Sequence, residues 1–229
     1  MSRSNITKQE ELTQISSYVS KLIKSKFGKG PETCYTSISD QYIIVHIKKF
    51  MTKIEYELVR KEDYTTAGKI RKNIMVDLLD PIQEMLEEIC DKPITQLYQD
   101  WNFQKNTGVL LAVVKAEQKA EMENSLEFML LRNEISKQSE FYQYQPNEQN
   151  FTKIGELIYI IRSAGYLLPI ERILIEKGMH ILEERENKIR KRYDANIYRF
   201  NKIIKKEITD IFMIWNYKND ESYKIFYCK

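Results

Sequence analysis

The segment Gly28-Lys29-Gly30-Pro31 is the first place where residue types suggest chemistry. Two glycines let backbone N–H groups form a concave nest for an anion, and a lysine adds positive charge, so Gly28, Lys29 and Gly30 are candidate anion-binding residues. The apolar pattern before them predicts a helix that ends at Gly28, which turns the negative end of the helix dipole toward the segment. We therefore favour the competing interpretation, in which Gly28 caps the helix and the segment is a turn.

The two tryptophans of the chain, Trp101 and Trp215, are each followed by asparagine and an aromatic residue. An exposed indole ring could stack on a ligand or a partner, so both are candidate partner-binding residues. A tryptophan that anchors a sheet against a helix, with the asparagine forming the next turn, would give the same pattern. Because the pattern occurs twice, we favour the packing interpretation.

A strongly basic stretch runs from Arg185 to Lys206, with nine basic residues against two acidic ones. If it is one helix, its apolar residues form one stripe and its cations another, which could bind an anionic lipid surface or nucleic acid. The candidate partner-binding cations of this stripe are Arg185, Arg192, Arg199 and Lys206. The apolar stripe consists of Ile189, Tyr193, Ile197, Phe200 and Ile204. We expect the cations to lie in solvent and the apolar residues to pack inward, so that any membrane contact is weak and electrostatic.

Metal binding and catalysis have no clear sequence signal. His46 and His180 are the only histidines, and zinc would need further nitrogen or sulfur ligands at suitable spacing. Glu55 and Glu171 stand where helices begin, and a carboxylate there caps the helix. No pairing of a nucleophile with a base is legible. We predict no catalytic residue, no metal and no cofactor, and we expect that the protein is not an enzyme.

The elements that carry these residues occur twice along the chain. The segment Ile94–Phe103 reappears as Ile208–Tyr217, 114 positions later. Upstream, Phe50–Glu55 lines up with Tyr166–Glu171, 116 positions later. The two offsets differ by two, which places a deletion of two residues in the helical stretch between these segments of the second copy. The sequence therefore predicts a tandem duplication, with one module at residues 1–117 and a second, diverged module at residues 118–229.

Each module is predicted to be α+β, in the order α-β-β-α-β-β. Thr7 with Glu10 and Thr52 with Glu55 have the capping-box spacing that begins a helix. Apolar residues then recur at helical spacing, and alternating segments between the helices indicate strands. The second of the helices is expected to be long, from Thr52 to Ile89 and, in the second copy, from Pro169 to Lys206. A mainly antiparallel four-stranded sheet packed by these helices would bury the apolar side of both.

Composition limits the class of protein. Apolar residues make up 42% and charged residues 30%, and there are only seven glycines, which indicates a folded, water-soluble chain. The net charge of +3 is split evenly, so neither half is a basic nucleic-acid-binding module. No apolar run is long enough to span a bilayer, and the start of the chain lacks a signal peptide. Three cysteines without ligand spacing fit reduced thiols, so we expect a cytoplasmic protein.

The order of the short motifs resembles the MpsC family over about residues 7–117. These motifs are the segment from Gly28 to Pro31, a hairpin, Met51-Thr52 with Glu55 and Leu58, and a long helix that contains Gly68. The family is the soluble component named after a Na⁺-translocating, membrane-potential-generating system. The second copy matches only from about Phe151. It lacks the Gly-Lys-Gly-Pro segment, and Leu168 takes the place of the threonine at the helix start.

This resemblance implies a cytosolic accessory role beside a membrane sodium or inorganic-carbon system. We therefore predict an accessory or regulatory protein that acts by binding a protein partner, with a membrane transport complex as the candidate. Modules of this kind are expected to pair by two-fold symmetry, so a homodimer is a further candidate and the duplicated chain would be a pseudo-dimer. One alternative is a small-ligand or anion sensor that uses Gly28–Gly30. Another is a nucleic-acid or membrane-surface binder that uses residues 185–206, although we expect no nucleic acid.

Overall fold

The computed structural model describes residues 7–115, 125–140, 145–177 and 182–229. The chain divides into two compact units, Met1–Ala120 and Glu121–Lys229, and each is described by itself. The predicted boundary between residues 117 and 118 lies outside the described residues. Within the described part of the chain, no helix is both long enough and apolar enough to cross a bilayer.

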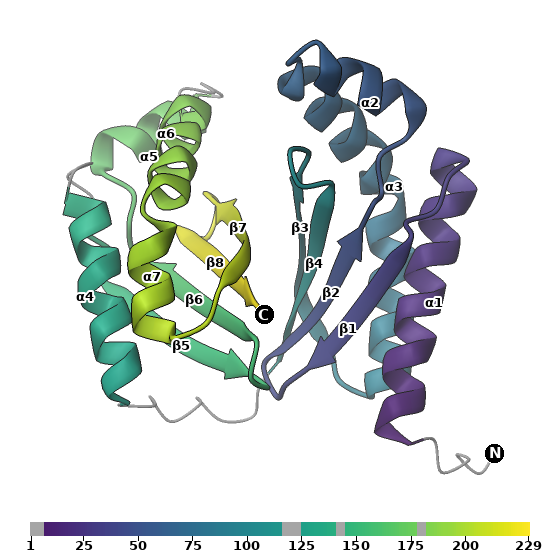
Figure 1. Cartoon of the computed structure of the whole chain (residues 1–229), viewed down its shortest axis with the longest axis horizontal. Helices are drawn as coiled ribbons and strands as arrows, with labels where there is room; N and C mark the ends of the chain where they lie inside the picture. Colours follow the sequence, from purple (N-terminus) through teal and green to yellow (C-terminus); the bar gives the residue numbers. More distant parts are fainter. Residues whose placement is uncertain (1–6, 116–124, 141–144, 178–181) are drawn as a thin grey trace. The chain divides into compact units, whose positions relative to one another are not determined.

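The first module has one antiparallel sheet of four strands, in the order β1-β2-β4-β3, with its helices on one face (Figure 1). Its elements are α1 (Lys8–Phe27), β1 (Thr33–Ile38), β2 (Tyr42–Lys48), α2 (Lys53–Arg60), α3 (Tyr64–Cys90), β3 (Ile94–Asn102) and β4 (Thr107–Val114). Alternate residues of β2 and β4 point to the helices, so Ile43, Val45 and Leu110 share one core with α1 residues such as Val19.

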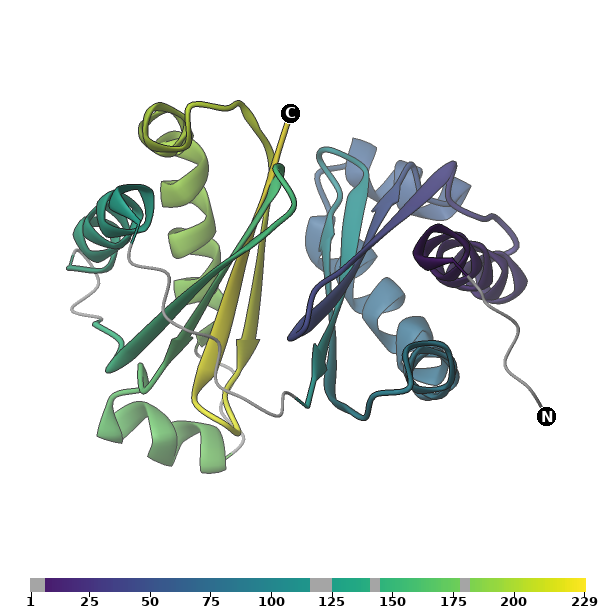
Figure 2. The ribbon, with the colours of Figure 1, turned by 90° about the horizontal axis from the view of Figure 1, so that it is seen from below.

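The second module repeats this topology, with strand order β5-β6-β8-β7 (Figure 2). Its elements are α4 (Leu126–Glu140), β5 (Glu148–Ile154), β6 (Ile158–Ala164), α5 (Pro169–Glu176), α6 (Leu182–Ala195), α7 (Ile197–Ile204), β7 (Ile208–Asn216) and β8 (Glu221–Cys228). Even the irregularities recur, because β3 and β7 each shift register at a threonine, Thr95 and Thr209. Both hydroxyls donate to a carbonyl of the neighbouring strand. The α+β class and the two similar modules are confirmed.

The predicted helix boundaries that rest on capping chemistry are confirmed. The Thr7 hydroxyl accepts from the Glu10 N–H, and the Glu10 carboxylate accepts from the Thr7 N–H. Thr52 and Glu55 form the same reciprocal pair at the start of α2. Gly28 follows α1 with φ 70°, a left-handed conformation that glycine adopts without a Cβ clash.

The predicted single long helix from Thr52 to Ile89 was wrong, because two helices occupy this range. α2 ends at Arg60, Glu62 has φ 61°, and the Asp63 carboxylate accepts from the Thr66 N–H to begin α3. The polar segment between the helices therefore acts as a turn and a new cap, although apolar residues recur on both sides of it. α3 itself is 27 residues long and contains Pro81.

The corresponding helix of the second module is also divided. α5 begins at Pro169 as predicted, and residues 178–181, between α5 and α6, lie outside the described residues. A further break separates α6 from α7, where the Asn196 side chain donates to the Arg192 carbonyl at 2.9 Å. The predicted single helix from Pro169 to Lys206 was therefore wrong. Side chains of α6 and α7 still share one core with the sheet, in which the Tyr193 ring stacks on the Phe200 ring.

Candidate functional site

Three connecting segments meet at one end of the first module, where α1 ends and α2 begins (Figure 1). We call residues 28–32, 49–56 and 103–106 the loop end. The Lys29 ammonium donates to the Met51 carbonyl at 2.7 Å, and the Met51 N–H donates to the Asn106 side-chain oxygen at 3.0 Å. The Asn106 amide nitrogen also lies 2.7 Å from the Tyr56 hydroxyl. These hydrogen bonds tie the three segments and the start of α2 to one another.

Beneath the loop end, Arg71 of α3 is completely buried. Its guanidinium binds the Glu55 carboxylate through two hydrogen bonds, at 2.6 Å from Nε and 2.7 Å from Nη2. Nη2 also lies 3.4 Å from the Phe50 carbonyl oxygen. A planar guanidinium and a carboxylate match in this two-bond geometry, which fixes both charge and direction. The pair therefore holds the first turn of α2 against α3.

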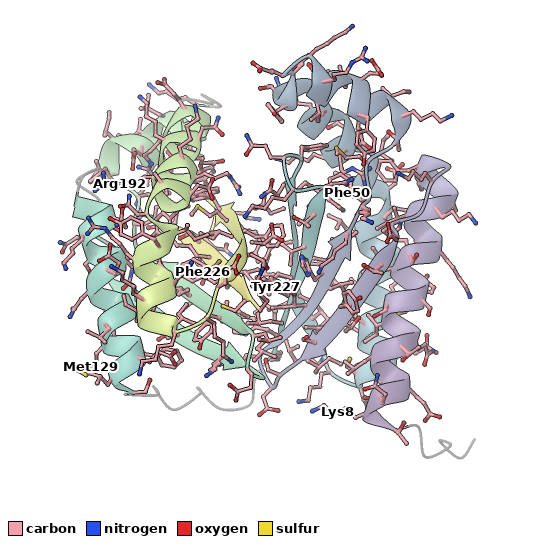
Figure 3. The ribbon with its side chains drawn as sticks, in the orientation of Figure 1. Lys8, Phe50, Met129, Arg192, Phe226 and Tyr227 are labelled. Atoms are coloured by element: carbon pink, nitrogen blue, oxygen red, sulfur yellow. The ribbon has the colours of Figure 1, made fainter. Side chains whose placement is uncertain are left out.

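Aromatic rings surround the same guanidinium. The Arg71 Cζ atom lies 4.0 Å from the ring centroid of Phe27, 4.3 Å from that of Phe50 and 4.8 Å from that of Trp101. Phe50 is labelled at this position in Figure 3. The Nη1 atom of Arg71 is buried without a hydrogen-bond partner among the described residues. The negative faces of the rings thus supply part of the stabilisation that water would otherwise give the cation.

Burial and ion pairing shift the pKa values of Glu55 and Arg71 in opposite directions. Burial by itself raises the pKa of the Glu55 carboxyl, but the hydrogen bonds and charge of Arg71 and the hydrogen bonds from Thr52 outweigh burial and leave that pKa lowered. Burial lowers the pKa of Arg71, and Glu55 opposes this change. Both groups stay charged, because each neutralises the other. The cluster is therefore built to hold the loop end in one shape.

The second module has a counterpart in which the same positions carry different groups. Arg185 pairs with Glu171, and its guanidinium lies 5.9 Å from the Tyr166 ring centroid. Only one of the two pairs is completely enclosed: the side chains of Arg71 and Glu55 are 0% and 2% exposed, whereas those of Arg185 and Glu171 are 16% and 12% exposed. Arg71 is missing from the residues singled out in the sequence. The signal was present, because Arg185 stands 114 positions after it, at the offset of the tryptophans.

The residue that ties the loops together also differs between the modules. Asp220 stands 114 positions after Asn106. One oxygen of the Asp220 carboxylate accepts from the N–H groups of Tyr166 and Leu167, both at 2.9 Å, and the other pairs with Arg172. A neutral amide and a tyrosine hydroxyl in the first module are thus replaced by an ion pair in the second. The backbone geometry is retained while the surface chemistry changes.

The two candidate tryptophans are half-buried. The Trp101 indole N–H donates to the Gln99 side chain at 2.7 Å, and the ring lies directly on Gly108. A Cβ atom at Gly108 would come within 2.2 Å of the indole, so only glycine fits there. Trp215 packs against the second core, with the Arg190 guanidinium 5.8 Å from its ring centroid. Partner binding by either indole stays a prediction.

The candidate anion-binding residues occupy the start of the loop end. Gly28 caps α1, as described above, and Gly30 lies so close to Lys24 that an added Cβ would be 3.2 Å from the Lys24 Cβ. Lys29 is exposed, and its ammonium is already engaged with the Met51 carbonyl. These contacts explain the segment as a connection between α1 and β1. Anion binding stays a prediction.

The expectation that the four cations of the basic stretch lie in solvent was wrong for three of them. Arg185 is turned toward Glu171, Arg192 (labelled in Figure 3) is half-buried, and Lys206 pairs with Glu156. Arg199 is exposed and lies 3.8 Å from Glu134. The break between α6 and α7 prevents one straight stripe, and the need to pair Glu171 draws Arg185 inward. The apolar side behaves as expected, because it is buried or packed against the core: Ile189, Tyr193, Ile197, Phe200 and Ile204.

Metal ligands do not gather within the described residues, where no group of three or more histidine, cysteine or acidic side chains could hold an ion. His46 is buried on β2, and His180 lies outside the described residues. The three cysteines are free thiols: Cys34, Cys90 and Cys228.

The first module matches a known protein family. The family model described as "Na+-translocating membrane potential-generating system (MpsC)" matches residues 7–116, a range that begins just before α1 and ends just after β4. A search of curated proteins and a search of solved structures returned no match. The matched range contains the whole loop end, together with the Glu55–Arg71 pair. The match covers 110 of the 229 residues, so it is the first module that is similar to the MpsC family.

Proposed function

We propose that the chain is a non-enzymatic, cytoplasmic accessory protein of a Na⁺-translocating, membrane-potential-generating system, and that it acts by binding a protein partner. The support for the system is the match of residues 7–116 to the family that bears this description. The matched range is a complete module with its own core, so the likeness concerns a whole folded unit.

The observation that carries the binding role is the way the polar groups at the loop end are used. Glu55 is engaged by Arg71 from beneath, the Lys29 ammonium by Met51, and the Asn106 side chain by Met51 and Tyr56. Groups that satisfy one another hold a surface in a fixed shape. A rigid surface of this kind favours recognition, because little flexibility has to be lost when a partner binds.

The first module is the one that we assign to partner binding. The second module has neither the Gly-Lys-Gly-Pro segment nor the Asn106 amide, and an ion pair between Arg172 and Asp220 covers the corresponding position. We assign the second module a supporting role as a diverged copy. Self-association into a homodimer stays a separate prediction.

The proposal is tested in the source organism by deleting the gene and measuring the Na⁺-dependent membrane potential. The wild-type gene should restore the potential, and a chain with Ile54→Glu should not, because Ile54 is 69% exposed at the loop end. Val76→Glu is the matched control, since Val76 is a 56% exposed apolar residue on α3, outside the loop end. An unchanged potential after deletion would refute the link to the system. Equal rescue by both variants would refute binding through the loop end.

A further inference from the structure

The loop end carries an excess of positive charge. Its acidic residues are Glu32, which pairs with Lys49 at 2.7 Å, and Glu55, which is buried with Arg71. The loop end therefore holds four lysines and one exposed carboxylate. All four lysine residues are exposed: Lys29, Lys49, Lys53 and Lys105.

Two apolar side chains stand among these lysines. Ile54 is 69% exposed and Tyr56 is 46% exposed, and both belong to the first turn of α2. The Lys29 ammonium lies 5.5 Å from the Tyr56 ring centroid, so the aromatic side chain lies between a cation and the Asn106 amide. An exposed aliphatic residue and a tyrosine with lysines beside them are typical of surfaces that enter the boundary between lipid headgroups and acyl chains.

The set of four lysines around Ile54 and Tyr56 does not follow from the fold itself, because the second module has the same fold without this set. At the offsets of the repeat, Gly165 replaces Lys49, Pro169 replaces Lys53, and Asn219 replaces Lys105. Arg172 replaces Tyr56 and is paired with Asp220. An exposed isoleucine, Ile170, is kept, but with a single exposed lysine, Lys218 in the place of Gln104, instead of four.

We propose that the loop end of the first module docks on an anionic phospholipid surface, with its lysines at the headgroups and with Ile54 and Tyr56 in the interfacial layer. The lysines come from three separate connections that all lie at one end of the module, an arrangement that can meet a flat charged surface at several points at once (Figure 1). This inference uses the surface that was assigned above to a protein partner, so the test must separate lipid from protein as the occupant of the loop end. It moves the predicted electrostatic membrane contact from residues 185–206 to the first module.

The test is co-sedimentation of the full chain with two kinds of vesicle. One kind is phosphatidylcholine alone, and the other is equal parts of phosphatidylcholine and phosphatidylserine. The wild-type chain should bind the anionic vesicles, and added salt should weaken this binding because it screens exposed charges. The double variant K53E/K105E should bind them at least about 25-fold more weakly, since each lysine near an anionic surface contributes roughly fivefold.

The matched control is K69E/K72E, which makes the same change in net charge at exposed lysines of α3. This control should bind nearly as well as the wild type. The apolar contribution is tested by Ile54→Ser, which should weaken binding by a factor of about ten. Circular dichroism of every variant checks the fold.

Three results would overturn the proposal. The first is a wild-type chain that ignores anionic vesicles at low salt. The second is an equal loss of binding in K53E/K105E and K69E/K72E, which would mean that only net charge matters. The third is a chain that ignores lipid vesicles but is retained by vesicles that contain the membrane proteins of the system. In that case the loop end recognises protein, and the proposed accessory function would survive without the lipid contact.

Discussion

The two modules share a fold but differ in how they enclose one ion pair. In the first, Arg71 and Glu55 are sealed under aromatic rings at the end that carries the family motifs. In the second, Arg185 and Glu171 keep the pairing with partial exposure. Arginine and glutamate have thus been retained at both sites while the loops above them changed. The ion pair therefore belongs to the architecture of the module, and the two modules differ mainly in the exposed residues at this end.

Breaking the ion pair should give the largest difference in unfolding free energy between the two modules. Glu55→Gln leaves the buried Arg71 cation without its counter-ion, which should cost the first module about 3–5 kcal/mol of unfolding free energy. Glu171→Gln should cost the second module about 1–2 kcal/mol, because water reaches that pair. Urea unfolding followed by tryptophan fluorescence measures both. A Trp215→Phe background reports on the first module and a Trp101→Phe background on the second.

The matched control for this pair of changes is Glu57→Gln. Glu57 forms an exposed ion pair with Arg60 on the same helix, so its loss should change stability by less than about 0.5 kcal/mol. Equal costs for Glu55→Gln and Glu171→Gln would show that enclosure of the ion pair does not affect the stability of the module.

The two modules also differ at one buried sheet position, which is a leucine in the first module and a lysine in the second. Lys224 of β8 takes the place of Leu110, and burial lowers the pKa of its ammonium to about 8 from 10.5. Below pH about 8 the lysine is protonated in the folded and unfolded states, and the buried charge reduces stability. Between pH about 8 and 10.5 the folded state loses the proton first, so stability should rise with pH.

Lys224→Leu should therefore stabilise the second module by about 3 kcal/mol at neutral pH and remove the rise at alkaline pH. The reverse change, Leu110→Lys, should destabilise the first module. The measurement is the difference in unfolding free energy between variant and wild type as a function of pH. A difference that does not change across this range would show that Lys224 keeps its ordinary pKa.

The contact between Trp101 and Gly108 gives a third contrast. Gly108→Ala should destabilise the first module by about 2 kcal/mol, because the new methyl group would overlap the indole ring. The corresponding residue of the second module is Ser222, whose buried hydroxyl has no hydrogen-bond partner among the described residues. Ser222→Ala should be neutral or slightly stabilising. A shift of the Trp101 emission spectrum in Gly108→Ala would report the displaced ring, and an unshifted spectrum with unchanged stability would contradict the prediction.

The smallest effect is expected at Lys29. Lys29→Ala removes the hydrogen bond to the Met51 carbonyl and should cost the first module about 1 kcal/mol. Lys153→Ala serves as a control in the second module, where the lysine makes long ion-pair contacts at 3.8 and 3.9 Å and, like Lys29, lies near a tyrosine ring, 5.3 Å from the Tyr159 centroid. It should change stability by less than about 0.5 kcal/mol. If Lys29→Ala has no larger effect than this control, the lysine does not hold the loop end together.

Much of the fold could be predicted because its signals are local and occur twice. The capping pair of Thr52 and Glu55, the cap at Gly28 and the strands all follow from residues near one another in sequence. The division of the long helix could not be predicted from apolar spacing, because suitable residues continue on both sides of Glu62. Turns of this kind depend on a positive φ and a new cap, which leave a weaker trace in the sequence than an apolar stripe.

The candidate site was predicted in outline only. Glu55 and Trp101 were identified as a capping residue and a packing residue, and both surround a guanidinium that the sequence did not single out. Arg71 stands beside Lys72 and near Lys69, which are both exposed, so its residue type alone does not indicate burial, and only the repeat with Arg185 sets it apart. The cations of residues 185–206 were singled out as a free surface, but Arg185 and Lys206 form ion pairs within the module. Helical spacing shows which residues share a stripe and does not show which side chains have a partner.

The sheet order has a consequence for biosynthesis. In each module the strand made last lies inside the sheet, since β4 separates β2 from β3 and β8 separates β6 from β7. In a nascent chain that ends at Asn106, β2 and β3 are complete but β4, the strand that lies between them, has not yet been made. Tyr42 of β2 can pair only after Val113, 71 positions later, has been added. Each module is therefore committed to folding after most of its residues have left the ribosome, and a ribosome that stalls just before β4 or β8 would leave a chain with open strand edges, suited to capture by chaperones or to aggregation.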